Sequence, residues 1–122
     1  MLLECNRVSA RYGAFRALKN ISVGIEEGQS VAVLGHNGSG KSTLLRCCVG
    51  AHGDVSGSVT FEGIAIVPGA VHRNVKLGIG FMPQGRNVFK DLAVEKNLLI
   101  AGAMRGDADI RKVYELFPIL QE

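Results

Sequence analysis

The sequence predicts an α/β fold, and three observations support this class. A run of β-branched residues and leucine, Ser30 to Leu34, leads into a glycine-rich loop, and a helix-compatible run, Ser42 to Val49, follows the loop. Two segments with partly alternating apolar residues precede this unit, as is typical of strands. From Val94 onward the patterns are helical. We therefore expect an α/β core with a small N-terminal antiparallel β subdomain and the start of a helical subdomain.

The expected elements follow one another without repeats or low-complexity tracts. The predicted strands are, in chain order, Leu2–Ala10, Ala17–Glu26, Ser30–Leu34, Ser58–Phe61 and Gly78–Met82. The predicted helices are Ser42–Val49, a short piece around Ala70–Val75, Val94–Met104 and Asp107–Leu116, the last ended by Pro118. A strand that precedes a loop of this kind is normally buried in a parallel sheet, and Gly78–Met82 is the best candidate for its partner.

The loop from Gly35 to Thr43 matches the pattern G-x-x-x-x-G-K-[ST], which binds phosphate groups between a strand and a helix. Its glycines allow the backbone to curl around an anion so that successive N–H groups point inward. Lys41 would place its charge between the β- and γ-phosphates of a nucleotide, and the Ser42 hydroxyl can ligate Mg²⁺. The predicted phosphate-binding residues are Gly35, Asn37, Gly38, Ser39, Gly40, Lys41, Ser42 and Thr43. A glycine-rich turn that binds nothing is the alternative, but it gives no packing reason for Lys-Ser-Thr.

Composition excludes several other classes of protein. The 122 residues carry a net charge of +3, and the basic residues are scattered, which argues against a nucleic-acid-binding surface. No stretch approaches the roughly 18 consecutive apolar residues of a membrane span. The three cysteines, Cys5, Cys47 and Cys48, include no C-x-x-C pair, so we expect reduced, buried thiols and no metal site.

Several separately placed motifs agree with one family. These are Tyr12-Gly13, the loop just described, the run Gly57–Gly63, and Met82-Pro83-Gln84. With them the chain resembles the N-terminal half of an ABC-transporter ATP-binding subunit, from about Leu2 to the last residue. The stretches that most resemble the subfamily for import of branched-chain amino acids are Pro83–Phe89, Val94–Leu98 and Val113–Pro118.

The resemblance implies a role for each matching residue. Tyr12 would stack on the adenine of ATP; the alternative is an aromatic residue at a β-turn that caps the small sheet. Gln84 would contact Mg²⁺ and the attacking water. The family architecture implies a nucleotide-binding part over about residues 1–90 and the start of a helical subdomain over about 91–122, together one partial domain. It also implies transmembrane permease subunits and a second ATP-binding subunit as partners, and a cytoplasmic location at the inner face of the membrane.

Three parts of the family's hydrolytic machinery do not occur in these residues: the signature motif, the catalytic Glu after a second apolar strand, and the switch His. We therefore expect ATP binding without efficient turnover by this chain alone, and poor stability of its incomplete sheet. Two other classes stay open: a soluble ABC ATPase unrelated to transport, and a non-catalytic or truncated nucleotide-binding module. A small nucleotide kinase shares the loop, but the contexts of Tyr12 and Gln84 argue against it.

Overall fold

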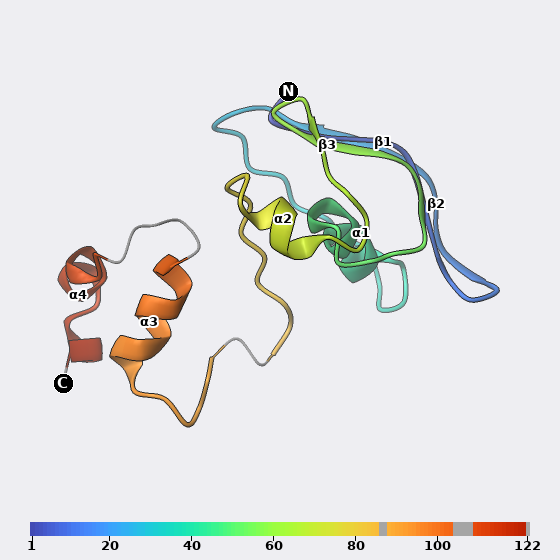
Figure 1. Cartoon of the computed structure of the whole chain (residues 1–122). Helices are drawn as coiled ribbons and strands as arrows, with labels where there is room; N and C mark the ends of the chain where they lie inside the picture. Colours follow the sequence, from blue (N-terminus) through green and yellow to red (C-terminus); the bar gives the residue numbers. More distant parts are fainter. Residues whose placement is uncertain (86–87, 104–108, 122) are drawn as a thin grey trace. The chain divides into compact units, whose positions relative to one another are not determined.

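The chain divides into two units, Met1–Ile79 and Gly80–Glu122 (Figure 1). The computed structural model describes residues 1–85, 88–103 and 109–121. All the strands of the described residues lie in the first unit, and the second unit is helical.

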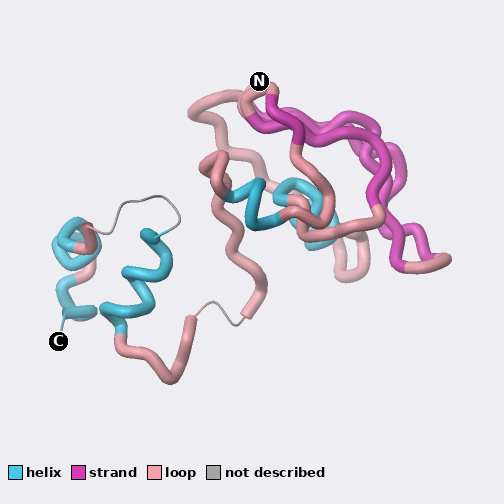
Figure 2. The backbone as a smooth tube through the Cα atoms, viewed as in Figure 1, coloured by secondary structure: helices cyan, strands magenta, loops and turns pink. Residues whose placement is uncertain are grey.

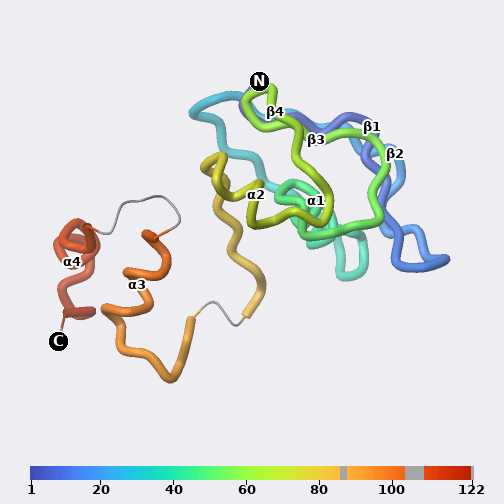
Figure 3. Tube along the Cα trace, in the orientation of Figure 1, coloured from blue at the N-terminus to red at the C-terminus, as the bar shows by residue number. Residues whose placement is uncertain are grey.

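The first unit contains one antiparallel sheet of four strands, in the order β2-β1-β3-β4 (Figure 3). The strands are β1 (Leu3–Tyr12), β2 (Phe15–Ile25), β3 (Val55–Phe61) and β4 (Ile64–Ala65). The predicted N-terminal antiparallel subdomain is present. It is larger than expected, because β3 begins three residues earlier than predicted and β4 lies where no strand was predicted.

A bulge in β1 explains why its sequence alternates only partly. Cys5 is buried, but the next buried residues of the strand are Val8 and Ala10, so the buried face changes phase between them. Arg7 has a φ of 49°, and the pairing of β1 with β2 and with β3 shifts register around it. Gly57 on β3 has a φ of 84°, and a Cβ there would lie 2.3 Å from the Arg7 carbonyl oxygen. Only glycine fits at position 57, where β3 passes the backbone of Arg7.

Helix α1 (Lys41–Val49) packs against one face of the sheet and contacts β1, β2 and β3 (Figure 1). It starts within one residue of the predicted position and ends at Gly50, whose φ of 76° is typical of a helix C-cap. The core between helix and sheet is apolar, as expected from burial-driven packing. Its buried members are Cys5, Val8, Ala10, Leu18, Leu44, Cys47, Val59 and Ile66.

Asn74 in the short helix α2 (Val71–Val75) ties this helix to the end of α1. Its side chain is fully buried, and its amide nitrogen donates to the carbonyl oxygens of Val49 at 3.0 Å and Val67 at 2.9 Å. Its amide oxygen accepts the Val67 N–H at 3.1 Å. Because every polar group of this buried side chain has a partner, Asn74 stabilises the turn between β4 and α2.

Two predicted strands, Ser30–Leu34 and Gly78–Met82, are wrong. Neither is a strand in the structure, and both are traced as loop in Figure 2. Their apolar side chains are largely exposed, to 89% for Leu34 and 79% for Met82. A strand needs a neighbouring backbone to satisfy its N–H and C=O groups, and among the described residues no strand lies beside either segment. The parallel pair expected from the sequence is therefore not formed.

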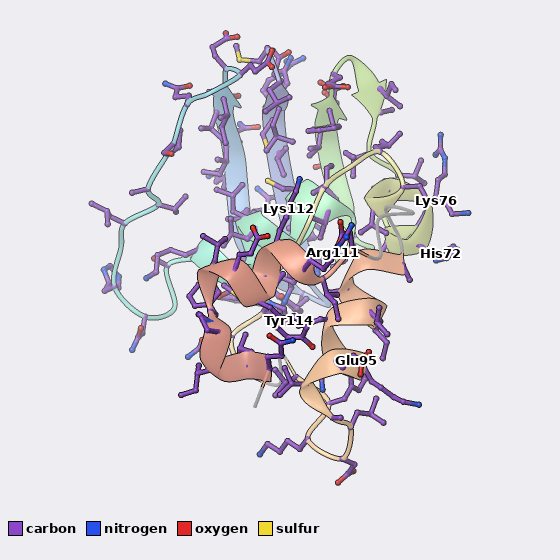
Figure 4. All side chains as sticks on the ribbon, turned by 90° about the vertical axis from the view of Figure 1, so that its left-hand side faces the viewer. His72, Lys76, Glu95, Arg111, Lys112 and Tyr114 are labelled. Carbon is purple, nitrogen blue, oxygen red and sulfur yellow. The ribbon has the colours of Figure 1, made fainter. Side chains whose placement is uncertain are left out.

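The second unit contains α3 (Val94–Ala103), α4 (Arg111–Leu116) and the 3₁₀ helix η1 (Pro118–Gln121), which contacts both. Figure 4 shows Glu95 on α3 and Arg111, Lys112 and Tyr114 on α4. The prediction for α3 is confirmed over the described residues, while α4 begins later than the predicted helix. The backbone N–H of Arg111 donates to the Asp109 carboxylate at 3.1 Å. The predicted positions Arg86, Asn87, Met104 and Asp107 lie outside the described residues.

Asn97 on α3 holds the preceding loop. Its side-chain oxygen accepts the Phe89 N–H at 2.8 Å, and its nitrogen donates to the carbonyl oxygens of Phe89, Leu92 and Ala93 at 3.1, 3.2 and 3.0 Å. The side chain thus gives hydrogen-bond partners to backbone groups of the loop that precedes α3. Asn74 is fully buried, whereas Asn97 is half-buried.

Candidate functional site

The segment from Gly35 to Gly40 forms a turn that leads directly into α1. Gly38 and Gly40 have φ values of 85° and 99°, a region that residues with a Cβ rarely enter. The Ser39 N–H donates to the His36 carbonyl at 3.2 Å, and the Leu44 N–H donates to the Gly40 carbonyl at 2.9 Å, which begins the helix. The backbone is therefore curled, neither extended nor helical, before the helix starts.

Close packing favours glycine at both ends of this turn, most strongly at Gly40. A Cβ at Gly35 would lie 2.6 Å from Ser39 Oγ, inside the turn itself. A Cβ at Gly40 would lie 2.8 Å from Leu18 Cδ2 and 2.9 Å from the Ala17 carbonyl oxygen, both on β2. Strand β2 thus packs directly on the start of α1, so the sheet fixes where the turn lies.

The ammonium group of Lys41 lies over the turn. It donates to the carbonyl oxygen of Gly35 and, at 2.9 Å, to that of His36. Within the described part of the chain it pairs with no carboxylate. A positive charge with neutral partners only, beside a glycine cradle and a helix N-terminus, suits an anionic ligand such as a phosphate.

The first turn of α1 is suited to anions and hard cations. It contains no acidic residue, so nothing cancels the positive end of the helix dipole. Ser42 is exposed there, and its hydroxyl oxygen is the type of ligand that Mg²⁺ prefers. No group of three His, Cys, Asp or Glu side chains that could hold a metal occurs among the described residues. A cation at this position would depend on Ser42 and on oxygen atoms of the ligand.

Tyr12 lies at the end of β1, next to the first turn of α1. Its hydroxyl is 3.3 Å from Thr43 Oγ1 and accepts a hydrogen bond from Arg46 Nη1 at 3.3 Å. The His52 ring lies edge-on to the Tyr12 ring, with centroids 4.6 Å apart and an interplanar angle of 62°. His52 Nε2 is in turn 2.6 Å from the Arg11 carbonyl oxygen.

These contacts hold the tyrosine ring while leaving much of it open. Tyr12 is 44% exposed, so a flat ligand can still reach it. The hydrogen bond with Thr43, and then the one from Arg46, lowers the pKa of the Tyr12 hydroxyl. The Thr43 side chain is buried, and its hydroxyl is engaged with Tyr12. For Thr43 the backbone N–H is therefore the better candidate for contact with a phosphate.

The structure brings the predicted residues of the first unit together and adds two that sequence reasoning missed. Arg46 lies three residues after Thr43 on one helix face, and this spacing could have pointed to it. His52 lies in the short connection between α1 and β3, and no comparable signal in the sequence points to it. Gln84 lies at an exposed bend in the second unit, and its role toward Mg²⁺ and water stays a prediction.

A family model described as ABC transporter matches residues 18–121, most of the chain. This chain belongs to the ABC transporter family. The predicted resemblance is thereby confirmed at the level of the family. Among the described residues no helix has the length and apolar character needed to cross a membrane.

Three curated relatives illustrate the similarity of this ABC-family chain. It is 38% identical to the high-affinity branched-chain amino acid transport ATP-binding protein BraG of Pseudomonas aeruginosa, over 99% of this chain and 54% of BraG. It is 40% identical to the probable branched-chain amino acid transport ATP-binding protein LivF of Archaeoglobus fulgidus, over 82% of this chain and 42% of that protein. It is 34% identical to the sulfate/thiosulfate import ATP-binding protein CysA of Pectobacterium atrosepticum, over 99% of this chain and 38% of CysA.

Solved structures support the same fold. The ABC-family chain matches a structure of an ATP-binding subunit of an ABC transporter with a TM-score of 0.80 and 24% identity, over all of this chain and 50% of that one. The predicted fold class is thus confirmed, although the two parallel strands are not formed. The chain spans about half the length of the curated relatives and structures it matches.

Proposed function

We propose that this chain binds ATP as the N-terminal part of an ABC transporter's ATP-binding subunit. The observation that carries the proposal is the curled turn Gly35–Gly40, with the Lys41 ammonium above it and α1 starting at its end. These are three features of one anion site, and they come from adjacent residues. The names of the three relatives, all ATP-binding proteins, support ATP as the ligand.

Each residue of the site has a task that its position suits. The loop N–H groups and Lys41 would hold the phosphates, since both present positive charge at one place. Ser42 would ligate Mg²⁺, which would neutralise part of the phosphate charge. The exposed face of Tyr12 would stack on adenine, with its ring kept in place by His52 and Arg46. Gln84 would orient the attacking water.

We further propose that the 122 residues bind ATP but do not turn it over efficiently alone. Phosphoryl transfer depends on positioned groups that stabilise charge in the transition state. The signature motif, the catalytic Glu and the switch His that the family uses do not occur in this sequence. Each missing group removes part of that stabilisation, so binding and hydrolysis should separate in this chain.

The assembly that we propose is an importer for a small solute. Permease subunits and a second ATP-binding subunit would be its partners, at the cytoplasmic face of the membrane. Branched-chain amino acids are the favoured solute because BraG and LivF carry that name, while CysA is named for sulfate and thiosulfate. A non-catalytic nucleotide-binding module is the alternative, and ATP binding that permease subunits leave unchanged would favour it.

Titration of the purified chain with a fluorescent ATP analogue and Mg²⁺ tests the phosphate site. Lys41→Ala should weaken binding at least about tenfold, because a charge-assisted contact to a phosphate is lost. Lys19→Ala, on an exposed position of β2, is the matched control and should bind like the parent chain. Equal affinities for the parent and Lys41→Ala would refute the assignment of this loop.

A further inference from the structure

The three cysteines gather where α1 packs on β1, outside the loop residues that we propose contact phosphate. Cys5 on β1 is 2% exposed, and Cys47 on α1 is buried as well. Cys48, also on α1, is half-buried, so one side of the group is open to a small solute. The Sγ atoms of Cys5 and Cys48 lie 3.7 Å apart.

We propose that Cys5 and Cys48 form a disulfide bond when the folded chain meets a peroxide. A disulfide has an S–S distance of about 2 Å, so the two sulfur atoms must approach by about 1.7 Å. Rotation about the two Cα–Cβ bonds would supply that movement. Successive side chains of a helix differ in direction by about 100°, so Cys47 and Cys48 cannot face Cys5 in the same way.

The surroundings give the two sulfur atoms different roles. The hydrogen bond with Cys48 lowers the pKa of Cys5 and raises that of Cys48, and burial further raises the Cys48 value. Cys5 is therefore the thiol that ionises first, and the thiolate is the reactive form. Cys48 lies in position to react with it in the second step.

The chemistry balances with one peroxide molecule. The Cys5 thiolate attacks one peroxide oxygen, the O–O bond breaks, and the departing oxygen takes up a proton as water, which leaves a sulfenic acid on Cys5. The Cys48 sulfur then attacks the Cys5 sulfur, the S–O bond breaks, and the hydroxyl leaves as water with the Cys48 proton. Two thiols are oxidised to one disulfide, and the peroxide is reduced to two molecules of water.

The bond would join the strand that ends at Tyr12 to the helix that begins at Lys41. At present, a hydrogen bond between Tyr12 and Thr43 links these two elements at the other end. The closed loop would span 43 positions of sequence, long enough for a marked loss of chain entropy in the unfolded state. This proposal does not depend on nucleotide binding, so it can fail or hold independently of the proposed function.

Peptide mapping after treatment of the full chain with hydrogen peroxide tests the pairing. The whole chain should lose about 2 Da, the mass of two hydrogen atoms, and the Cys5–Cys48 peptide should appear in several-fold excess over Cys5–Cys47. The same treatment in guanidinium chloride is the control. There the two loops differ by one residue, so the two products should be nearly equal.

Two variants sharpen the test. Cys47→Ser should form the disulfide like the parent chain, whereas Cys48→Ser should not lose 2 Da readily under the same conditions. The oxidised parent should melt at a higher temperature than the reduced one. The proposal is overturned if native oxidation gives as much Cys5–Cys47 as Cys5–Cys48, if Cys47 and Cys48 pair with each other instead, or if oxidation lowers the melting temperature.

Discussion

Strand β1 and the segment Ser30–Leu34 both contain apolar residues, but only β1 forms a strand. Val8 in β1 is completely buried, while Val33 is 39% exposed. β1 is paired on both sides, by β2 and β3, whereas Ser30–Leu34 lies outside the sheet. The difference shows that an apolar run becomes a strand only when a neighbouring backbone satisfies its polar groups. In this chain the sheet and α1 share the buried core, whereas the apolar side chains of Ser30–Leu34 are exposed.

A matched pair of truncations should reveal this contrast most strongly. Val8→Ala should lower the free energy of unfolding by about 2–3 kcal/mol, because it removes two buried methyl groups and leaves a cavity. Val33→Ala makes the same chemical change at an exposed site and should cost less than about 1 kcal/mol. Urea denaturation of both variants measures the two values. Equal costs would mean that Ser30–Leu34 is as well packed in solution as β1.

A second pair compares two asparagines that hold loops in the two units. Asn74→Ala should cost about 1–2 kcal/mol, because the Val49 carbonyl and the Val67 N–H lose the hydrogen bonds that the Asn74 side chain supplies. Asn97→Ala should cost about 0.5–1 kcal/mol, since its side chain is only half-buried and water can replace the lost bonds. Hydrogen exchange at the Val67 and Phe89 amides reports each loss directly. A larger effect at Asn97 than at Asn74 would reverse the comparison.

The smallest expected effect is a dependence of stability on alkaline pH. Burial raises the pKa of the Cys47 thiol from 9.0 to about 11. The folded chain thus keeps a proton that the unfolded chain releases, so the free energy of unfolding should fall as the pH rises from 9 to about 11. Cys47→Ala should make this fall shallower under reducing conditions. An identical slope in parent and variant would show that Cys47 is more exposed to water than the structure has it.

The local features of this molecule could be predicted from its sequence. The turn Gly35–Gly40, the start of α1, the hairpin of β1 and β2, and α3 all depend on residues close together in the chain. Turn glycines, a loop lysine and regular apolar spacing are local signals, so they predict these elements well.

Features that depend on distant partners could not be predicted in the same way. The strand character of Ser30–Leu34 depends on a neighbour that composition does not reveal. The bulge at Arg7 depends on Gly57, and the hold on Tyr12 depends on His52. For the bulge and for Tyr12, a residue far along the chain decides the geometry. Only the structure shows which residue that is.

The central claim is that the main-chain amides from Gly35 to Thr43 bind the phosphates of a nucleotide. The most direct measurement is amide NMR of the isotope-labelled chain during titration with ADP and Mg²⁺. We expect the largest shifts at the amides of residues 38–43, with smaller ones around Tyr12. Saturable shifts that leave residues 35–43 unmoved, or no shift at all at millimolar nucleotide, would contradict it.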